Sequence, residues 1–360
     1  MSKFTVKSDV LQTMLSKAYK GASRSKFNVM TNLVSVELID SKLSLTTTDS
    51  NNYFTVTETV SGENTSFVVN VDTFSKLISK ISTESITIDV SDDTITINGN
   101  GTYKLPIQLD VDGSPIKYPK KTINTADCSG TIKTAIIKNV ILYNKPSLAT
   151  SFEMPCLTGY LFTENNVISA DVFNICVYHV NTFGKKILLA PIVLDLLSMS
   201  TDEEISYKIS DDFIMFETSN MKLFATLMNG VDDYPVESIM NRVDTEYPSK
   251  CVLPKTTVLN IIDRISLFIN DNDQNGVYLT FTKDGLKIES SRADCIESVP
   301  YQGSENWKDY SCFASVDSIK RQFNARVGES INLYYGDEDT FMIADDNVKQ
   351  LSALLDDDRG

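Results

Sequence analysis

Residues 67–98, FVVNVDTFSKLISKISTESITIDVSDDTITIN, have a pattern that occurs three times in the chain. The pattern predicts a strand, a short helix and a hairpin, and residues 187–217 and 311–343 repeat that order. The three hairpin turns are acidic: Asp92-Asp93, Asp211-Asp212 and Asp337-Glu338-Asp339. Successive turns lie 119 and 126 residues apart, so the repeating unit has the size of a whole domain. Three similar domains in one chain favour a closed architecture.

The other half of each repeat is also visible. Apolar and polar residues alternate, as in a half-buried strand pair, within residues 33–60, 159–180 and 275–301. An amphipathic helical pattern precedes each of these segments, at residues 7–20, 130–143 and 254–269. Each domain therefore reads as helix, strands, helix, strands, which predicts an α+β fold with antiparallel sheets and two helices per domain. Periodicity lapses at YPKKTIN (118–124) and DTEYPSK (244–250), so the expected domains are residues 1–120, 121–248 and 249–360.

Composition is typical of a globular protein, with 42% hydrophobic and 22% charged residues among 360. The six cysteines are scattered without a C-x-x-C pair, which favours buried reduced thiols over a disulfide or metal framework. The N-terminal MSKFTVKSDV lacks a signal-like apolar region, and the longest apolar stretch, residues 187–197, is short and contains Asp195. We expect a cytoplasmic protein without a membrane span.

The distribution of charged residues along the chain indicates what kind of molecule the protein binds. The net charge of −15 argues at first against nucleic acid. However, the six predicted helical stretches (7–26, 71–81, 130–145, 190–200, 254–269 and 316–327) hold 15 Lys and Arg against 5 Asp and Glu. They are therefore net +10, and the remainder of the chain is net −25. A solvated helix surface explains any single lysine, but five of the six helices agree. This pattern favours a helix-lined surface for the phosphate backbone, without sequence specificity.

The residues expected to contact DNA are the basic side chains of these helices. They are Lys7, Lys17, Lys20, Arg24, Lys76, Lys80, Lys133, Lys138, Arg264, Lys320, Arg321 and Arg326. Their 3/4 spacing in places, as at Lys76 and Lys80, puts neighbours on one helix face. An acidic remainder should discourage DNA from binding elsewhere on the protein.

No catalytic, cofactor or metal site is expected from the sequence. The single histidine, His179, has no Cys or carboxylate neighbours at fixed spacing, and NGNG at 98–101 reads as a turn, not as a phosphate loop. The pairs Asp92-Asp93, Asp211-Asp212, Asp232-Asp233 and Asp345-Asp346 could be imagined as divalent metal sites. Aspartate is favoured in hairpin turns for its geometry, which is the better interpretation. A metal-dependent nucleic-acid enzyme using these pairs, and a structural protein binding through its sheets, stay open as alternatives.

Several segments, in order along the chain, resemble the bacterial-type DNA polymerase III beta subunit, the sliding clamp that makes the polymerase processive. They are KFTV (3–6), NLVSVELIDSKLSLTTTDSN (32–51), LTGYLF (157–162), ISADVFNICV (168–177) and GVYLTFTKDGLKI (276–288). The resemblance implies three similar domains per chain, and two chains head to tail in a ring around duplex DNA with helices inside. It also implies a non-enzymatic role, with a DNA polymerase and a clamp loader as partners.

Ring size agrees independently with two chains. Six helices packed ~10 Å apart give a perimeter of about 60 Å and, after a helix width of about 10 Å, a hole of about 9 Å. Twelve helices give a perimeter of about 120 Å and a hole of roughly 28 Å, which admits duplex DNA and water. One chain is too small to encircle DNA.

By matching position, the resemblance places Tyr103 and Leu105 of one chain against Phe268 and Ile269 of the other at the dimer interface. It implies a greasy cleft for polymerase and loader, formed by Leu157, Val172, Phe173, Asn174, Ile175, Pro235 and Ile239, with Leu351, Leu354 and Leu355 from the C-terminal segment. Val172-Phe173-Asn174-Ile175 replaces the family's Gly-His-Arg-Leu, and the ending LSALLDDDRG differs from the family's apolar ending. We expect an altered docking peptide and a phage-encoded member.

Overall fold

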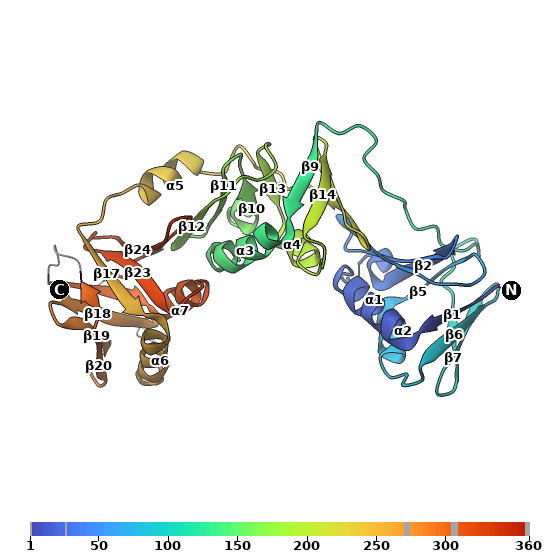
Figure 1. Ribbon diagram of the computed structural model, residues 1–360, viewed down its shortest axis with the longest axis horizontal. Helices are drawn as coiled ribbons and strands as arrows, with labels where there is room; N and C mark the ends of the chain where they lie inside the picture. The colour runs from blue at the N-terminus through green and yellow to red at the C-terminus, as the bar shows by residue number, and fades with distance from the viewer. Residues whose placement is uncertain (1, 26, 270–273, 304–308, 357–360) are drawn as a thin grey trace. The chain divides into compact units, whose positions relative to one another are not determined.

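The computed structural model describes residues 2–25, 27–269, 274–303 and 309–356. The chain divides into two compact units, one formed by residues 1–137 and 192–227, the other by residues 138–191 and 228–360 (Figure 1). Both units are α+β with antiparallel sheets, which confirms the predicted fold class. The predicted middle domain, residues 121–248, contributes to both units. The boundaries near residues 120 and 248 stay a prediction.

Unit 1 holds two sheets. Its elements are β1 (Ser2–Lys7), α1 (Ser8–Lys20), η1 (Val29–Asn32), β2 (Leu33–Ile39), β3 (Lys42–Thr48), β4 (Asn52–Thr59), β5 (Thr65–Asn70), α2 (Val71–Ile78), β6 (Ser85–Val90), β7 (Thr94–Asn98), β8 (Thr102–Pro106), β9 (Cys128–Lys133), β14 (Glu204–Ile209), β15 (Phe213–Glu217) and β16 (Met221–Thr226). The four-stranded sheet runs β1-β6-β7-β8, and the eight-stranded sheet runs β5-β2-β3-β4-β16-β15-β14-β9. The eight-stranded sheet therefore joins strands of two repeats at β4 and β16.

Unit 2 has the same construction. Its elements are η2 (Lys145–Ser147), η3 (Pro155–Thr158), β10 (Tyr160–Phe162), β11 (Asn166–Ala170), β12 (Asn174–His179), β13 (Ile187–Leu189), α5 (Val236–Val243), β17 (Ser249–Pro254), α6 (Lys255–Ile265), η4 (Ser266–Phe268), β18 (Gly276–Thr282), β19 (Gly285–Ser290), β20 (Ile296–Val299), β21 (Gln302–Gly303), β22 (Tyr310–Ser315), α7 (Val316–Asn324), β23 (Ser330–Tyr335), β24 (Thr340–Ala344) and β25 (Val348–Ala353). One sheet runs β13-β10-β11-β12-β25-β24-β23-β17-β21, and the other runs β20-β19-β18-β22. α3 (Thr134–Asn144) and α4 (Pro191–Leu197) straddle the division between the units.

The same backbone hydrogen bond occurs at the equivalent place in all three repeats. After each acidic hairpin, an aspartate carbonyl accepts from an amide beyond the following strand: Ile107 N to Asp93 O at 2.8 Å, Leu227 N to Asp212 O at 2.8 Å, and Leu354 N to Asp339 O at 2.7 Å. The predicted hairpin turns at 92–93, 211–212 and 337–339 are therefore confirmed. β8, β16 and β25 are equivalent strands of the three repeats.

The helices cover the sheets with their apolar sides, as their periodicity predicts. In α1, Leu11, Met14, Leu15 and Ala18 are buried, four residues that share one face. The second helix of a repeat starts at a polar cap: Asn70 Oδ1 accepts from Thr73 N, and Ser315 Oγ accepts from Ser318 N. These caps end the preceding strands and fix where α2 and α7 begin.

Two local expectations were wrong, and one helix was not predicted. The segments at 33–60, 159–180 and 275–301 form three strands each, not a strand pair. A second tight turn supplies the extra strand: Asp49 Oδ1 accepts from Asn52 N, and Asp171 Oδ1 accepts from Asn174 N. Residues 130–133 belong to β9, which pairs with β14, so α3 begins only at Thr134. The segment around 244–250, read as a boundary, follows an unpredicted helix, α5.

No helix in the described part of the chain combines the length and the apolarity that a membrane crossing requires.

Candidate nucleic-acid interface

The first cationic surface lies on the helix pair α1 and α2 of unit 1, which lie side by side in Figure 1. Gln12 fixes the pair because its Nε2 donates to Ile78 O (3.0 Å) and to Ile81 O (2.8 Å) at the end of α2. With the apolar sides buried, the solvent-facing sides carry most of the predicted DNA contacts of this repeat. Lys7, Lys20, Arg24, Lys76 and Lys80 are exposed, and Lys17 is half-buried.

A chain of polar contacts links this surface across the two helices. Lys76 Nζ lies 2.6 Å from Asp72 Oδ2, and Tyr19 donates its hydroxyl to Asp72 Oδ1 at 2.8 Å. Arg24 donates to Tyr19 Oη at 2.6 Å, and its guanidinium lies 4.6 Å from the centre of the Tyr19 ring. The hydrogen bonds from Lys76 and Tyr19 lower the pKa of Asp72, and the same carboxylate raises the pKa of Lys76. Both groups are charged over the whole physiological pH range.

The equivalent helices of unit 2, α6 and α7, carry Arg264, Lys320 and Arg321. Lys320 Nζ lies 2.8 Å from Asp263 Oδ1, which joins α7 to α6. Arg264 donates from Nε (2.8 Å) and from a terminal nitrogen (2.6 Å) to the two oxygens of Glu297 on β20. This bidentate pair raises the pKa of Arg264 and lowers the pKa of Glu297. Arg321 is exposed, and no carboxylate of the described residues lies within ion-pair distance of it.

The middle repeat contributes less charge. Lys133 at the end of β9 and Lys138 on α3 are both exposed. α4 has no basic residue, as its sequence requires. The structure thus presents eleven of the twelve predicted cations at least partly to solvent, on helices or in the strand ends, turns and loops next to them. Their contact with DNA stays a prediction.

Arg326 is the exception, and its assignment to DNA contact was wrong. The residue is 4% exposed, and its guanidinium binds Asp345 Oδ2 at 2.9 Å and the carbonyl of Ile343 at 2.7 Å. The same group also donates to Val348 O at 3.3 Å. The sequence placed Arg326 at the end of a basic helix, but the chain leaves α7 at Asn324 and turns this side chain inward. Arg326 ties the hairpin of β24 and β25 to the end of α7.

Replacing Arg326 with alanine is therefore expected to destabilise the protein. Buried carbonyls lose their donors and a cavity forms, which together should cost about 2–4 kcal/mol of unfolding free energy. Denaturant unfolding measures this difference. The matched control is Arg321→Ala, an exposed arginine of the same segment, for which we expect less than about 0.5 kcal/mol. Equal losses for the two variants would contradict the structural role of Arg326.

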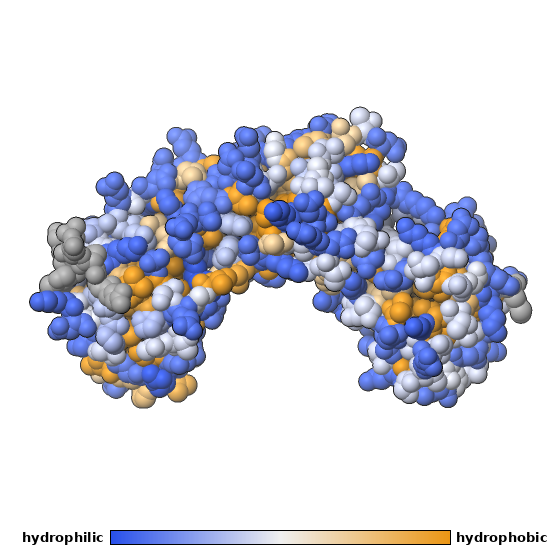
Figure 2. Space-filling model, in the orientation of Figure 1, coloured by the Kyte–Doolittle hydropathy of each residue, from blue (hydrophilic) through white to orange (hydrophobic). Residues whose placement is uncertain are grey.

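Among the described strands, each of the four sheets ends on both sides in a strand that pairs with one neighbour only, and β8 and β20 are two of these end strands. Tyr103 and Leu105 lie on β8 and are half-buried. Phe268 ends η4 and is 48% exposed, and Ile269 follows it, half-buried. Figure 2 shows hydrophobic surface over α6 and β20 at the lower left, where Leu267, Phe268 and Ile296 are exposed. The predicted interface residues therefore lie at or beside unpaired edges of the fold.

The predicted cleft residues lie together in unit 2, but they differ in exposure. Leu157, Ile239 and Leu351 belong to one buried cluster, at 6%, 4% and 2% exposure. Asn174 is also buried, and its Oδ1 accepts a hydrogen bond from Ser352 Oγ at 2.8 Å. These four side chains are closed to solvent, and their part in a docking cleft stays a prediction. The others offer surface: Val172 and Phe173 are exposed, and Ile175, Pro235, Leu354 and Leu355 are half-buried.

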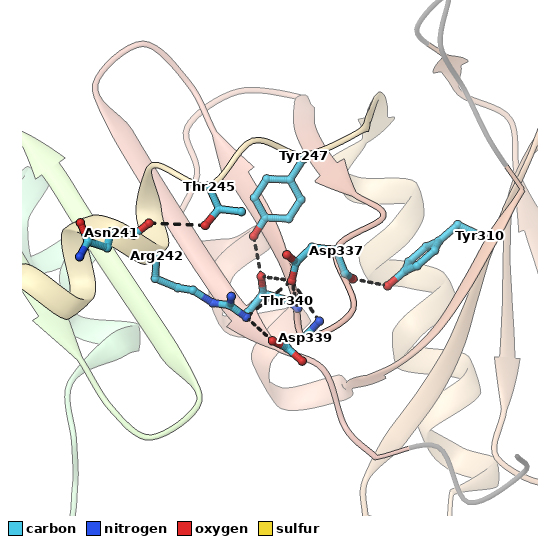
Figure 3. Close-up of polar contacts among 8 residues, drawn as sticks. All are labelled: Asn241, Arg242, Thr245, Tyr247, Tyr310, Asp337, Asp339 and Thr340. Carbon is cyan, nitrogen blue, oxygen red and sulfur yellow. Dashed lines mark hydrogen bonds and ion pairs between the residues drawn. The ribbon is translucent and has the colours of Figure 1, made fainter.

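Sequence reasoning missed one anchor of this region, shown in Figure 3. Arg242 lies at the end of α5, and its Nη2 is 2.8 Å from Asp339 Oδ2 and 3.6 Å from Asp337 Oδ1. Tyr247 contacts Thr340 hydroxyl to hydroxyl at 2.6 Å. Asp337 itself accepts from the amides of Asp339 and Thr340, so it forms the hairpin turn as the sequence suggested. The connector after α5 is thereby fastened to the hairpin of β23 and β24.

The six thiols differ in exposure. Cys156, Cys176, Cys251 and Cys312 are buried, and Cys128 and Cys295 are partly exposed. Burial raises the pKa of Cys176, Cys251 and Cys312 to about 12. Because alkylation requires the thiolate, we expect iodoacetamide at pH 8 to modify Cys128 before these three. Mass spectrometry of the native protein tests this, with the unfolded protein as control. Labelling of Cys176 as fast as Cys128 would contradict it.

Within the described ranges, no three His, Cys, Asp or Glu side chains come together as a possible metal site.

Comparison with known proteins gave three findings. The family model of the DNA polymerase III beta subunit, N-terminal domain, matches residues 2–116. The sequences of curated proteins gave no match. Among solved structures, the DNA polymerase III beta subunit of Thermotoga maritima has a TM-score of 0.85 at 15% identity, covering 99% of this chain and 100% of that one.

Two further solved structures agree with this similarity. The griselimycin-bound sliding clamp of Pseudomonas aeruginosa has a TM-score of 0.86 at 14% identity, covering 99% of each chain. The DNA polymerase sliding clamp of Bacillus subtilis has a TM-score of 0.83 at 19% identity, again covering 99% of each. The whole chain therefore has the DNA clamp fold.

Proposed function

We propose that this chain is a sliding clamp of the DNA polymerase III beta subunit type: two copies close head to tail around duplex DNA and tether the replicative polymerase. The role is mechanical and involves no turnover. The observation that carries the proposal is that β8 and β20 each end a sheet, because the threefold repeat assigns each of these two strands a partner.

Support comes from the two seams inside the chain. β4 of the first repeat pairs with β16 of the second, and β12 of the second pairs with β25 of the third. β16 and β25 are equivalent to β8, while β4 and β12 are equivalent to β20. By the same rule, β8 pairs with β20 of a second copy. Two such pairings close a ring of two chains in which every repeat is joined to a repeat on each side, as closed cyclic symmetry requires.

The register of this third seam follows from the other two. Leu105 precedes Ile107 by two residues, as Ala225 precedes Leu227 and Ser352 precedes Leu354, so these three residues are equivalent. Ala225 lies opposite Asn52, and Ser352 lies opposite Asn174.

The residue equivalent to these two asparagines is Cys295. Its carbonyl accepts from Ser290 N at 3.0 Å, as Asn52 O accepts from Asp49 N at 3.3 Å. The seam would therefore place Leu105 opposite Cys295 of the partner subunit. Tyr103 would lie opposite Glu297 of the partner subunit.

The DNA side of the proposal rests on the exposed cations of the helices. A ring that surrounds its ligand needs only weak contacts, because closure prevents escape while non-specific phosphate contacts permit sliding. The acidic remainder of the chain would keep DNA off other surfaces.

For the polymerase and the clamp loader, we propose the surface that includes Val172 and Phe173. These two apolar side chains are 80% and 57% exposed at the turn between β11 and β12. Because this turn departs from the family's sequence, we propose a dedicated docking peptide. A phage origin stays a prediction drawn from the same departures.

The test is topological retention. A clamp assembled on nicked circular DNA should resist a high-salt wash and should be lost when the circle is cut. Equal retention on circular and linear DNA would contradict encirclement and would indicate ordinary groove binding.

A further inference from the structure

We propose that Asp72 and Asp263 act as built-in counterions, which weaken the hold of the helix surface on DNA so that the ring slides. This inference deepens the proposed clamp function and rests on it. Both carboxylates lie beside cations that would otherwise face the phosphates, and both belong to helices that carry a predicted DNA contact.

At α1 and α2, one carboxylate serves two cations. Asp72 Oδ2 binds Lys76 Nζ directly at 2.6 Å, and Asp72 Oδ1 reaches Arg24 through the Tyr19 hydroxyl. Lys76 is the more exposed partner of its pair, with 71% of its side chain accessible against 39% for Asp72. The cations are thus directed toward a shared carboxylate, and the group of three charges is net +1.

At α6 and α7, the arrangement recurs with different residues. Asp263 on α6 holds Lys320 of α7 at 2.8 Å, and Ser266 Oγ lies 3.4 Å from the same ammonium. The position equivalent to Asp263 in α1 is Ser16, because Leu11, Met14 and Leu15 correspond to Val258, Ile261 and Ile262. The repeats therefore place a counterion by separate routes, not as a relic of one shared residue.

The physical consequence concerns counterion release. A lysine that contacts a phosphate releases cations condensed on the DNA, and this release favours binding. The log of the affinity therefore falls with the log of the salt concentration, with a slope of about −0.9 per phosphate contact. A lysine that already holds a carboxylate must give up that pair to make the same contact. Exposed ion pairs are weak and exchange readily, so the lysine can alternate between carboxylate and phosphate. Such alternation lowers the affinity of each contact without removing it.

The repeat supplies a matched control in Asp317. Asp72 and Asp317 are both the second residue of their helix, after a capping residue and a buried valine. Lys76 and Arg321 lie at equivalent positions four residues further on. Asp72 holds Lys76, whereas Asp317 has no ion pair within the part of the chain that the structure describes. The two aspartates thus share charge and helix position but differ in pairing.

The experiment compares Asp72→Asn with Asp317→Asn in the full-length protein. Fluorescence anisotropy measures binding to a short blunt-ended duplex, onto which the ring can thread, as a function of salt. We expect Asp72→Asn to steepen the salt slope by about 2 for a ring of two chains, one added contact per chain, and to tighten binding roughly tenfold at low salt. Asp317→Asn should change both quantities much less.

A second variant ties the effect to the pair. Adding Lys76→Gln to Asp72→Asn should remove most of the gain, because the cation that Asp72 holds directly is then absent. Asp263→Asn should behave like Asp72→Asn, whereas Glu297 is left untouched because it lies on the proposed seam strand β20. Equal behaviour of Asp72→Asn and Asp317→Asn would overturn the counterion role. If the clamp function itself were wrong, the wild-type protein would instead fail to stay on nicked circles.

Discussion

Oxidation of a Leu105→Cys variant is expected to lock the protein onto circular DNA as a covalent ring. The proposed seam puts position 105 opposite the native Cys295 of the partner subunit. In the two internal seams, the residue equivalent to Leu105 is Ala225 or Ser352. The next residue along the strand donates its amide across the seam, Thr226 N to Asn51 O and Ala353 N to Phe173 O. The equivalent residue and its partner therefore form a non-hydrogen-bonded pair, with Cα atoms about 4.5 Å apart, within the reach of a disulfide.

One substitution thus creates two disulfides per ring, one at each seam. Mixed with nicked circular DNA at low salt and then oxidised, the variant should give a dimer that stays on the circle even in denaturing detergent. Two disulfides make the paired chains a closed macrocycle, which the circle threads. Cutting the DNA should release all of it, and reduction should do the same. Gel analysis of protein that co-migrates with the DNA measures the outcome.

The controls separate register from topology. Leu105→Cys with Cys295→Ser should not cross-link, and Lys104→Cys, whose side chain lies on the other face of β8, should not either. Failure of Leu105→Cys to cross-link in a dimeric protein would refute the proposed register. Efficient cross-linking without retention on circles would refute encirclement.

Reversing the charge of the helix surface is expected to remove most of the attraction to DNA. The variant replaces four exposed cations, Lys20, Lys80, Lys138 and Arg321, with glutamate. If each contacts one phosphate, a ring of two chains loses eight contacts, and the salt slope of duplex binding should fall by up to about 7. Anisotropy on a short duplex measures the slope, and sedimentation checks that the dimer persists.

In a control variant with the same change in net charge, the four reversed lysines lie on strands or in the turn between two strands. It replaces the exposed residues Lys42, Lys208, Lys283 and Lys287 with glutamate. These belong to β3, β14, β19 and the turn before β19. We expect a much smaller effect, limited to long-range repulsion that salt screens within about 10 Å at 0.1 M. If both variants lost the same affinity, net charge and not the helix surface would govern binding.

Local patterns were read correctly wherever neighbouring residues decide the structure. The acidic turns at 92–93 and 211–212 are such cases, because aspartate favours turns through contacts with its own backbone. The buried side of α1 is another, since Leu11, Met14 and Leu15 share one face by helical spacing alone. The errors came where a distant partner intervened. Residues 130–133 look helical by themselves, but β14 recruits them into a sheet.

The candidate site divides in the same way. Sequence alone picked out the basic helices, because their excess of Lys and Arg needs no coordinates to be counted. It misassigned Arg326, whose burial depends on Asp345 and on the carbonyls of Ile343 and Val348. It also missed the pairing of Lys320 with Asp263, residues of different helices.

The threefold period, the α+β class and the positive helices of this protein could be predicted from residue order alone, since they follow from short-range periodicity and composition. How the repeats join depends on contacts that are distant in the chain. β4 meets β16, and β12 meets β25, between residues more than 100 positions apart in the chain. Strand edges carry the same backbone groups whatever their side chains, so pairing is selected by how the packed helices and sheets present those edges, which local sequence does not encode.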